Sequence, residues 1–369
     1  TYRQMTDQDR FATETSPRHI ERADVDANDF HVRATAEKLL SGARLDFGLD
    51  VNGRYGLEAE DVIIDYDMAG NETSRNVNPT IEDADRTDTG LFLSAEGAVH
   101  PVVDLAGGAR FDWVTTQNTG GYFGSRSTSN SAFSGYGSAT VGSFGGFNFT
   151  AQVSRGFRDP VLSDRYFRGV TGRGFITGNP DLDPETSLQF DTGVRYTSGA
   201  WRGGIFFFEY HINDLIERYQ EGPDLFFFRN RGEARIRGFE LELQSDLPRE
   251  VHLEVVFQRQ DGRLLDDDTP LDDISPMTFL FQLRKDLGPK AFVQARWAFY
   301  AEDDEPGPTE IAMPGWNVFD VSAGYKFDPR LELRFLGRNL FNESYPVSSD
   351  ARAVLAPGIS GILSLLVRL

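Results

Sequence analysis

The stretch FDVSAGYKF, residues 319–327, decides the fold. Its odd positions are apolar or small, and its even positions are polar or glycine. Successive side chains of a β-strand point to opposite faces, so a period of two gives one apolar face and one wet face. A short turn at 328–330 follows, and the alternation resumes in LELRF, residues 331–335. The stretch therefore predicts two consecutive strands.

The same alternation recurs along the chain. It is clear at 45–51, 103–113, 147–153, 188–196, 239–244, 251–258 and 293–299. The pattern predicts about fifteen strands. They begin near residues 30, 43, 89, 102, 133, 147, 187, 201, 226, 250, 277, 291, 316, 331 and 359.

The connections between these strands alternate in length. Short turns are expected near residues 41, 101, 145, 198, 247, 288 and 328. Between them lie long polar connections at 58–88, 114–130, 158–186, 213–225, 260–276, 302–315 and 343–358. Outer-membrane barrels place short turns at the periplasmic end and long loops outside.

A soluble β-sandwich is the alternative, because its strands also carry one apolar face. Three features favour the barrel. The wet face is densely charged, aromatic residues gather near strand ends, and many strands reach ten residues or more. The sequence therefore predicts an all-β protein, a transmembrane antiparallel β-barrel.

Composition excludes several functions. Lys and Arg number 37 against 57 Asp and Glu, a net charge of -20, which argues against a nucleic-acid partner. The chain has no cysteine, so thiolate chemistry is absent. We find no Ser-His-Asp arrangement or other catalytic motif, so no enzyme is predicted. No metal site or cofactor is predicted either.

Counting gives an orientation. If the short turns are periplasmic, the strand near residue 30 runs inward, and residues 1–29 are expected to form an extracellular loop. Bacterial single-chain barrels close with an even number of strands. The odd count predicts that residues 1–369 are the C-terminal portion of a larger barrel.

Ordered motifs give these strands a family resemblance. FRDP at 157–160 and NPDLDPETS at 179–187 resemble the "FRxP … NPxLxPE(T/S)" pair of TonB-dependent receptors. Residues 208–216, 230–241 and 338–345 resemble three further family blocks in the expected order. The resemblance implies a barrel of about 22 strands whose lumen is plugged. The plug domain is expected to lie outside residues 1–369.

The resemblance also implies a function. It is TonB-energised uptake of a scarce ligand across the outer membrane of a Gram-negative cell, with a ferric siderophore favoured. Uptake of cobalamin or a carbohydrate, and a passive porin-like channel, remain alternatives. The resemblance implies that haem-uptake members carry a histidine between the two motifs. Residues 161–178 contain none, which disfavours haem as the ligand. The implied partners are outer-membrane lipid or lipopolysaccharide, the TonB complex through the plug, and a small molecule such as a metal chelate.

Two sets of residues are singled out. The family-motif set is expected to be structural: Phe157, Arg158, Pro160, Asn179, Pro180, Leu182, Pro184, Glu185, Asn339, Leu340, Phe341 and Tyr345. The ligand-binding set joins cationic and aromatic side chains suited to an anionic, ring-bearing ligand: Arg165, Tyr166, Phe167, Arg168, Arg173, Phe227 and Arg229. Acidic runs at 266–268, 272–273 and 302–305 raise a Ca²⁺ hypothesis, but a solvated acidic surface is the favoured interpretation.

Overall fold

A computed structural model describes residues 2–171, 174–350 and 353–368. It is almost entirely β-structure, as the alternation predicts. No helix in the described ranges is long and apolar enough to cross a membrane. The elements are β1 (Tyr2–Arg10), β2 (His19–Leu40), β3 (Ala43–Tyr66), β4 (Glu72–His100), β5 (Val103–Asn118), β6 (Arg126–Phe144), β7 (Phe147–Arg158), α1 (Leu162–Tyr166), β8 (Arg168–Thr171), β9 (Gly174–Thr177), β10 (Glu185–Ser198), β11 (Trp201–Gly222), β12 (Leu225–Leu247), β13 (Val251–Leu264), β14 (Thr278–Leu287), β15 (Ala291–Tyr300), β16 (Trp316–Asp328), β17 (Leu331–Arg338) and β18 (Ser360–Val367).

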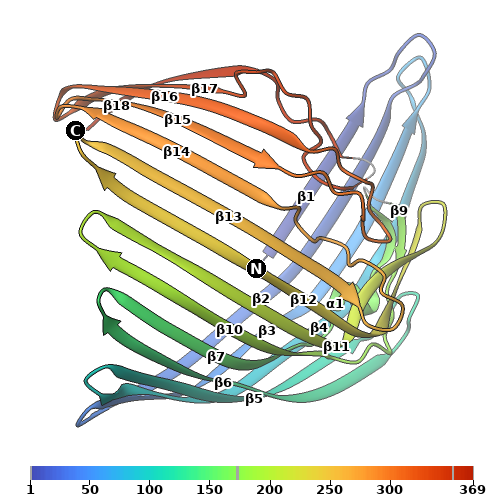
Figure 1. The fold of residues 1–369 in the computed structure, drawn as a ribbon. Coiled ribbons are helices and arrows are strands. Elements are labelled where there is room, and N and C mark those ends of the chain that lie inside the picture. The colour runs from blue at the N-terminus through green and yellow to red at the C-terminus, as the bar shows by residue number, and fades with distance from the viewer. Residues whose placement is uncertain (1, 172–173, 351–352, 369) are drawn as a thin grey trace.

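The strands form one strongly curved antiparallel meander (Figure 1). Consecutive strands pair from β1 to β7, β7 pairs with β10, and pairing continues to β18. The turns between paired strands are short at one end of the sheet, on the left in Figure 1, and the longer connections lie at the other end. Every predicted strand start falls inside an observed strand or one residue before it. We call the two ends the turn end and the loop end.

Cross-strand register sorts the side chains onto two faces. Phe281 pairs with Trp297, which pairs with Phe319, and these apolar residues share one face. One residue along, Gln282 pairs with Arg296, which pairs with Asp320 on the other face. Exposed apolar side chains on the first face continue across the sheet at Leu49, Leu91, Phe133, Phe190, Phe207, Leu283, Phe335 and Leu363. This is the arrangement of a barrel wall with an apolar outer face and a polar inner face.

Three expected connections are different in the structure. Most of the expected loops 58–88 and 213–225 is strand, because β3, β4, β11 and β12 continue into tall hairpins. In residues 2–29, β1 pairs with the first part of β2, so most of this stretch is strand. Their extracellular placement stays a prediction. A strand beyond the membrane meets water or folded loops on both faces, so it loses the period of two that identifies strands in the sequence.

Buried apolar side chains form small clusters at the loop end. The largest contains Ala27, Leu57, Ile81, Leu162 and Tyr166, which come from β2, β3, β4 and α1. A second lies where β12 and β13 meet the following connection, and a third surrounds Trp316. The hydrophobic packing therefore fixes the connections, while the wall itself is held by strand pairing.

Candidate functional site

The β7–β10 connection, residues 159–184, bridges two separated parts of the wall. At one side, α1 and β8 pack against β4. At the other side, β9 pairs with β12 in parallel, with Phe175 opposite Leu225 and Thr177 opposite Phe227. The strands β5, β6, β7, β10 and β11 lie between these two attachment points in the meander. Arg86, on the polar face of β4, donates to the carbonyl oxygen of Pro160 at 2.8 Å, so the bridge crosses the inner face.

Arg165 is the centre of this bridge. Its side chain is 0% exposed, and its Nη1 donates to the carbonyl oxygen of Pro180 at 2.7 Å. Its Nη2 lies 3.9 Å from an Asp159 carboxylate oxygen, and both side chains are fully buried. Asn130 on β6 donates to the same carboxylate at 2.5 Å. Arg165 therefore ties the start of the connection to its end.

Burial raises the pKa of Asp159. The hydrogen bond from Asn130 and the positive charges of Arg86 and Arg165 oppose this rise. Two arginines and one amide thus compensate a carboxylate that water no longer reaches.

The family-motif residues make contacts that shape the connections, within the β7–β10 connection and to the β11–β12 hairpin. Arg158 pairs with Asp164 at 2.7 Å, and the Asn179 amide donates to the carbonyl oxygen of Phe228 at 3.1 Å. Glu185 accepts from the backbone N–H of Ile216 at 2.9 Å. Pro160 and Leu182 are buried. Phe157 and Pro184 lie beside these anchors in the chain.

The second motif block caps the β17–β18 connection. The buried Asn339 amide donates to the carbonyl oxygen of Glu343 at 2.8 Å, and its carbonyl accepts from the Glu343 N–H. The Leu340 N–H donates to the carbonyl oxygen of Phe319. Tyr345 stacks on Trp316, with 5.2 Å between the ring centroids. Phe341 stacks on Phe319 and is exposed.

The expected ligand-binding set divides. Arg165 and Tyr166 are buried in the anchor, and their role in ligand binding stays a prediction. Sequence could not separate them from their neighbours, because burial here depends on α1 packing against strands far away in the chain. Phe167 is half-buried against the largest cluster. Arg173 lies outside the described residues.

Arg168 is exposed and lies between two aromatic rings. Its guanidinium is 4.3 Å from the Tyr122 ring centroid and 4.9 Å from that of Phe175. Tyr122 is 68% exposed. The β8–β9 pairing places Arg168 opposite Thr177, and Thr177 is opposite Phe227 on β12. The fold therefore brings Arg168, Phe175 and Phe227 onto neighbouring strands.

Arg229 lies on the β11–β12 hairpin beside this group. It stands 4.4 Å from the Tyr219 ring centroid and pairs with Glu217 at 2.8 Å. The ring centroid of Phe227 lies 6.0 Å from that of the same tyrosine. We call Tyr122, Arg168, Phe175, Tyr219, Phe227 and Arg229 the cation–aromatic group.

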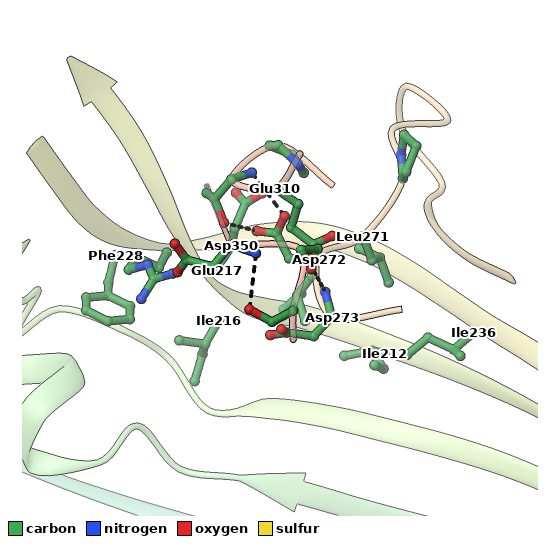
Figure 2. A pocket seen from close by; sticks show the side chains of 17 residues that line it. Ile212, Ile216, Glu217, Phe228, Ile236, Leu271, Asp272, Asp273, Glu310 and Asp350 are labelled. Carbon is green, nitrogen blue, oxygen red and sulfur yellow. Dashed lines mark hydrogen bonds between the residues drawn. The ribbon is translucent and has the colours of Figure 1, made fainter. Parts of the chain in front are cut away.

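A cavity of about 360 Å³ lies between the β11–β12 hairpin and three connections (Figure 2). Its apolar side includes Ile212, Ile216 and Leu271. Its acidic side includes Asp272 and Glu310. Glu310 accepts from the backbone N–H groups of Asp273 and Gly307, each at 3.1 Å, and from the Ser349 hydroxyl. This one carboxylate therefore fastens three connections together.

The acidic loop residues act mainly as such fasteners. Asp272 accepts from the Thr309 N–H at 3.0 Å and from its hydroxyl at 2.8 Å, and Asp267 pairs with Arg231 at 2.6 Å. Among the described residues, no group of three or more His, Asp or Glu is arranged to hold a metal ion. Sequence reasoning did not identify Thr309, Glu310 or Ser349, because nothing in their local pattern indicates contacts between connections.

The loop fasteners should respond to pH. Burial raises the pKa of Asp272, with Thr309 opposing the rise. A carboxyl whose folded pKa exceeds its unfolded pKa carries a penalty above the folded pKa, and that penalty disappears as pH falls below the unfolded value. We expect amide exchange of residues 265–277 and 301–315, corrected for intrinsic rates, to slow as pH falls from 7 towards 4. Asp272→Asn should flatten this dependence, and an equal slope in both proteins would contradict it.

The geometry of the sheet defines the class of protein. A curved antiparallel wall with an apolar outer face, a charged inner face and folded connections at one end is the wall of a transmembrane β-barrel. Residues 1–340 match the family model described as "TonB dependent receptor-like, beta-barrel", so the chain belongs to that family.

Two curated relatives match about half of the chain. The ferric enterobactin receptor PirA of Pseudomonas aeruginosa is 24% identical over 241 residues, 56% of this chain and 32% of the relative. The vitamin B12 transporter BtuB of Vibrio vulnificus is 28% identical over 206 residues, 55% of this chain and 32% of the relative. The matched region thus spans about a third of either relative. Both carry the names of a receptor or transporter and not of an enzyme.

Solved structures share the fold. The copper transporter OprC superposes with a TM-score of 0.80 at 17% identity, covering 94% of this chain and 58% of that one. The unliganded ferric citrate transporter FecA superposes with a TM-score of 0.72 at 12% identity. The match covers 99% of this chain and 57% of that one. At these identities, the likeness concerns the fold alone.

Proposed function

We propose that this chain forms part of the barrel wall of an outer-membrane receptor. The receptor takes up a scarce ligand by TonB-energised transport. The observation that carries the proposal is the family match over residues 1–340, together with the wall's apolar outer face and polar inner face. The loop end then faces outside, and the charged inner face surrounds the transport path. Outer-membrane lipid and the TonB complex are the proposed partners.

Energised uptake is distinguished from passive diffusion by its dependence on TonB. The test uses the full-length protein, expressed in a Gram-negative strain that lacks its own receptor for the supplied ligand. We expect uptake to stop when TonB function is removed. Uptake that continues down a concentration gradient without TonB would support the porin-like alternative and refute the proposal.

A ferric siderophore is the favoured ligand. Guanidinium groups held against aromatic rings suit an anionic, ring-bearing molecule, because the charge attracts the anion and the rings cover its apolar surface. The cation–aromatic group supplies these chemical groups at the loop end. Cobalamin is the second candidate, favoured by the similarity to a vitamin B12 transporter. Growth of a deletion strain under iron limitation or cobalamin limitation separates the two.

Arg168 offers a direct test of the ligand hypothesis. We expect Arg168→Ala to weaken binding of a ferric siderophore at least about five-fold, since a hydrogen bond from a guanidinium group to an anion contributes about 1.5–3 kcal/mol. Arg173→Ala is tested beside it. Arg202→Ala is the control, because Arg202 is also exposed but lies at the turn end, paired with Asp246. Unchanged affinity in both the Arg168 and the Arg173 variants would remove these arginines from the site.

A further inference from the structure

One sector of the inner face carries no charged side chain. On β6 and β7, Phe133 and Val153 are exposed on the apolar outer face, where they pair with Phe111 and Phe190. Because the facing alternates along a strand, the even-numbered residues of these two strands point inward. Those within 134–140 and 148–154 are all neutral and polar. We call them the neutral strip: Ser134, Tyr136, Ser138, Thr140, Asn148, Thr150, Gln152 and Ser154.

Other parts of the inner face are joined by ion pairs. On β5, Arg110 pairs with Asp112 at 2.7 Å. On β15 and β16, Arg296 lies 3.3 Å from Asp320. Within the described ranges, no ion pair involves any residue from 134 to 154. The neutral strip therefore offers hydrogen bonds without a fixed charge.

Two hollows open along the neutral strip. One, of about 700 Å³, is lined by Tyr136, Gln152 and Ser154, among others. The other, of about 890 Å³, is lined by Thr140, Thr150 and Gln152, among others. Gln152 lines both, so the hollows adjoin on β7. The hydroxyls of Thr140 and Thr150 lie 3.2 Å apart, which shows that the contacts within the strip are short and neutral.

The loop end of the neutral strip begins next to the β7–β10 connection. Asn130 precedes Ser134 by four residues on the same face of β6, and its amide donates to buried Asp159. Asp159 opens the connection that carries Arg168 of the cation–aromatic group. This connection therefore links the proposed external binding site to the start of the strip.

We propose that the transported ligand passes through the lumen along the neutral strip. Passage requires several contacts that are favourable enough to admit a ligand and weak enough to release it. Hydrogen bonds between neutral groups are weaker than those that involve a charge, so hydroxyl and amide side chains meet this requirement. They also suit an oxygen-rich metal chelate, because they donate to its surface oxygens. The inference rests on the proposed transport function and assigns the part of the wall that the ligand follows.

The test measures uptake by the full-length protein in intact cells. The probe is ferric enterobactin with radioactive iron, or cyanocobalamin with radioactive cobalt if the growth test selects cobalamin. Gln152→Trp narrows both hollows at the place where they adjoin. We expect it to lower the maximal TonB-dependent uptake rate about ten-fold or more, while the Kd for the probe on de-energised cells stays within about two-fold.

Gln258→Trp is the matched control. Gln258 carries the same side chain on the inner face of β13, between Glu240 and Thr278, and it lines neither hollow. We expect this variant to keep its uptake rate within about two-fold of the wild type.

A second variant separates blockage from misfolding. Residues 1–369 contain no cysteine, so Gln152→Cys places one thiol in this range, within a full-length protein free of other cysteines. A bulky maleimide is attached after the protein has assembled in the outer membrane. We expect uptake to fall after labelling and to stay normal without it. Heat-dependent electrophoretic mobility checks the folding of every variant.

Three results would overturn the proposal. The first is an unchanged uptake rate in folded Gln152→Trp and in labelled Gln152→Cys. The second is an equal loss in Gln152→Trp and Gln258→Trp, since any bulky group in the lumen would then act alike. The third is a weakened Kd in Gln152→Trp that accounts for its slower uptake. Wild-type uptake that continues without TonB would instead refute the proposed function, and the path along the strip with it.

Discussion

Leu283→Arg is expected to destabilise the folded protein in a lipid bilayer by about 2–4 kcal/mol, whereas Gln282→Arg should change its stability by less than about 1 kcal/mol. Leu283 lies midway along β14 on the outer face, between Leu253 and Ala295. An arginine there meets hydrocarbon and loses its hydration. Gln282 lies one residue away on the inner face, where its amide donates to Glu254 at 3.1 Å. An arginine there gains a carboxylate neighbour and stays in water.

The two variants add the same charge one residue apart, so they isolate the direction of the side chain. Urea unfolding in bilayers of fixed composition, followed by electrophoretic mobility, measures both. Equal stability of the two variants would contradict the transmembrane assignment of β14. A soluble sheet that buries Leu283 against a second layer would also lose stability, but it would unfold reversibly in detergent-free buffer, and this protein should not.

Arg165→Ala should unfold the β7–β10 connection while leaving the wall paired. The substitution removes a fully buried side chain, its hydrogen bond to Pro180, and one of the two cations near buried Asp159. Removing one partner of a buried charged pair costs about 3–5 kcal/mol, since the other charge is left uncompensated. Amide exchange of residues 159–184 should therefore increase strongly, with ligand uptake lost.

Arg168→Ala is the matched control for this result. Arg168 lies three residues later in the same connection, but its guanidinium is exposed between two rings. We expect normal amide protection in this variant, with ligand affinity alone reduced. If Arg165→Ala also kept normal protection, Arg165 would not anchor the connection.

The alternating sequence determined most of the wall. Strand pairing needs only an extended backbone, and a strand between lipid and water must alternate, so β14 to β17 were predictable in place and in facing. The aromatic and charged faces followed from the same period. Asn179 and Asn339 accept hydrogen bonds from backbone N–H groups two and four residues further along the chain, so these contacts depend on local sequence.

Tertiary structure decided what the connections do. Arg165, Tyr166 and Arg168 are nearly consecutive, yet two are buried and one is exposed, because α1 packs against β2, β3 and β4 from the other side of the connection. The strands of the tall hairpins were not predicted, because neither of their faces meets lipid and their sequences therefore lack the period of two. Contacts such as Glu310 with Ser349 join residues from separate connections. The local period of a sequence records which medium each face meets, but long-range packing depends on the curvature that brings distant strands together.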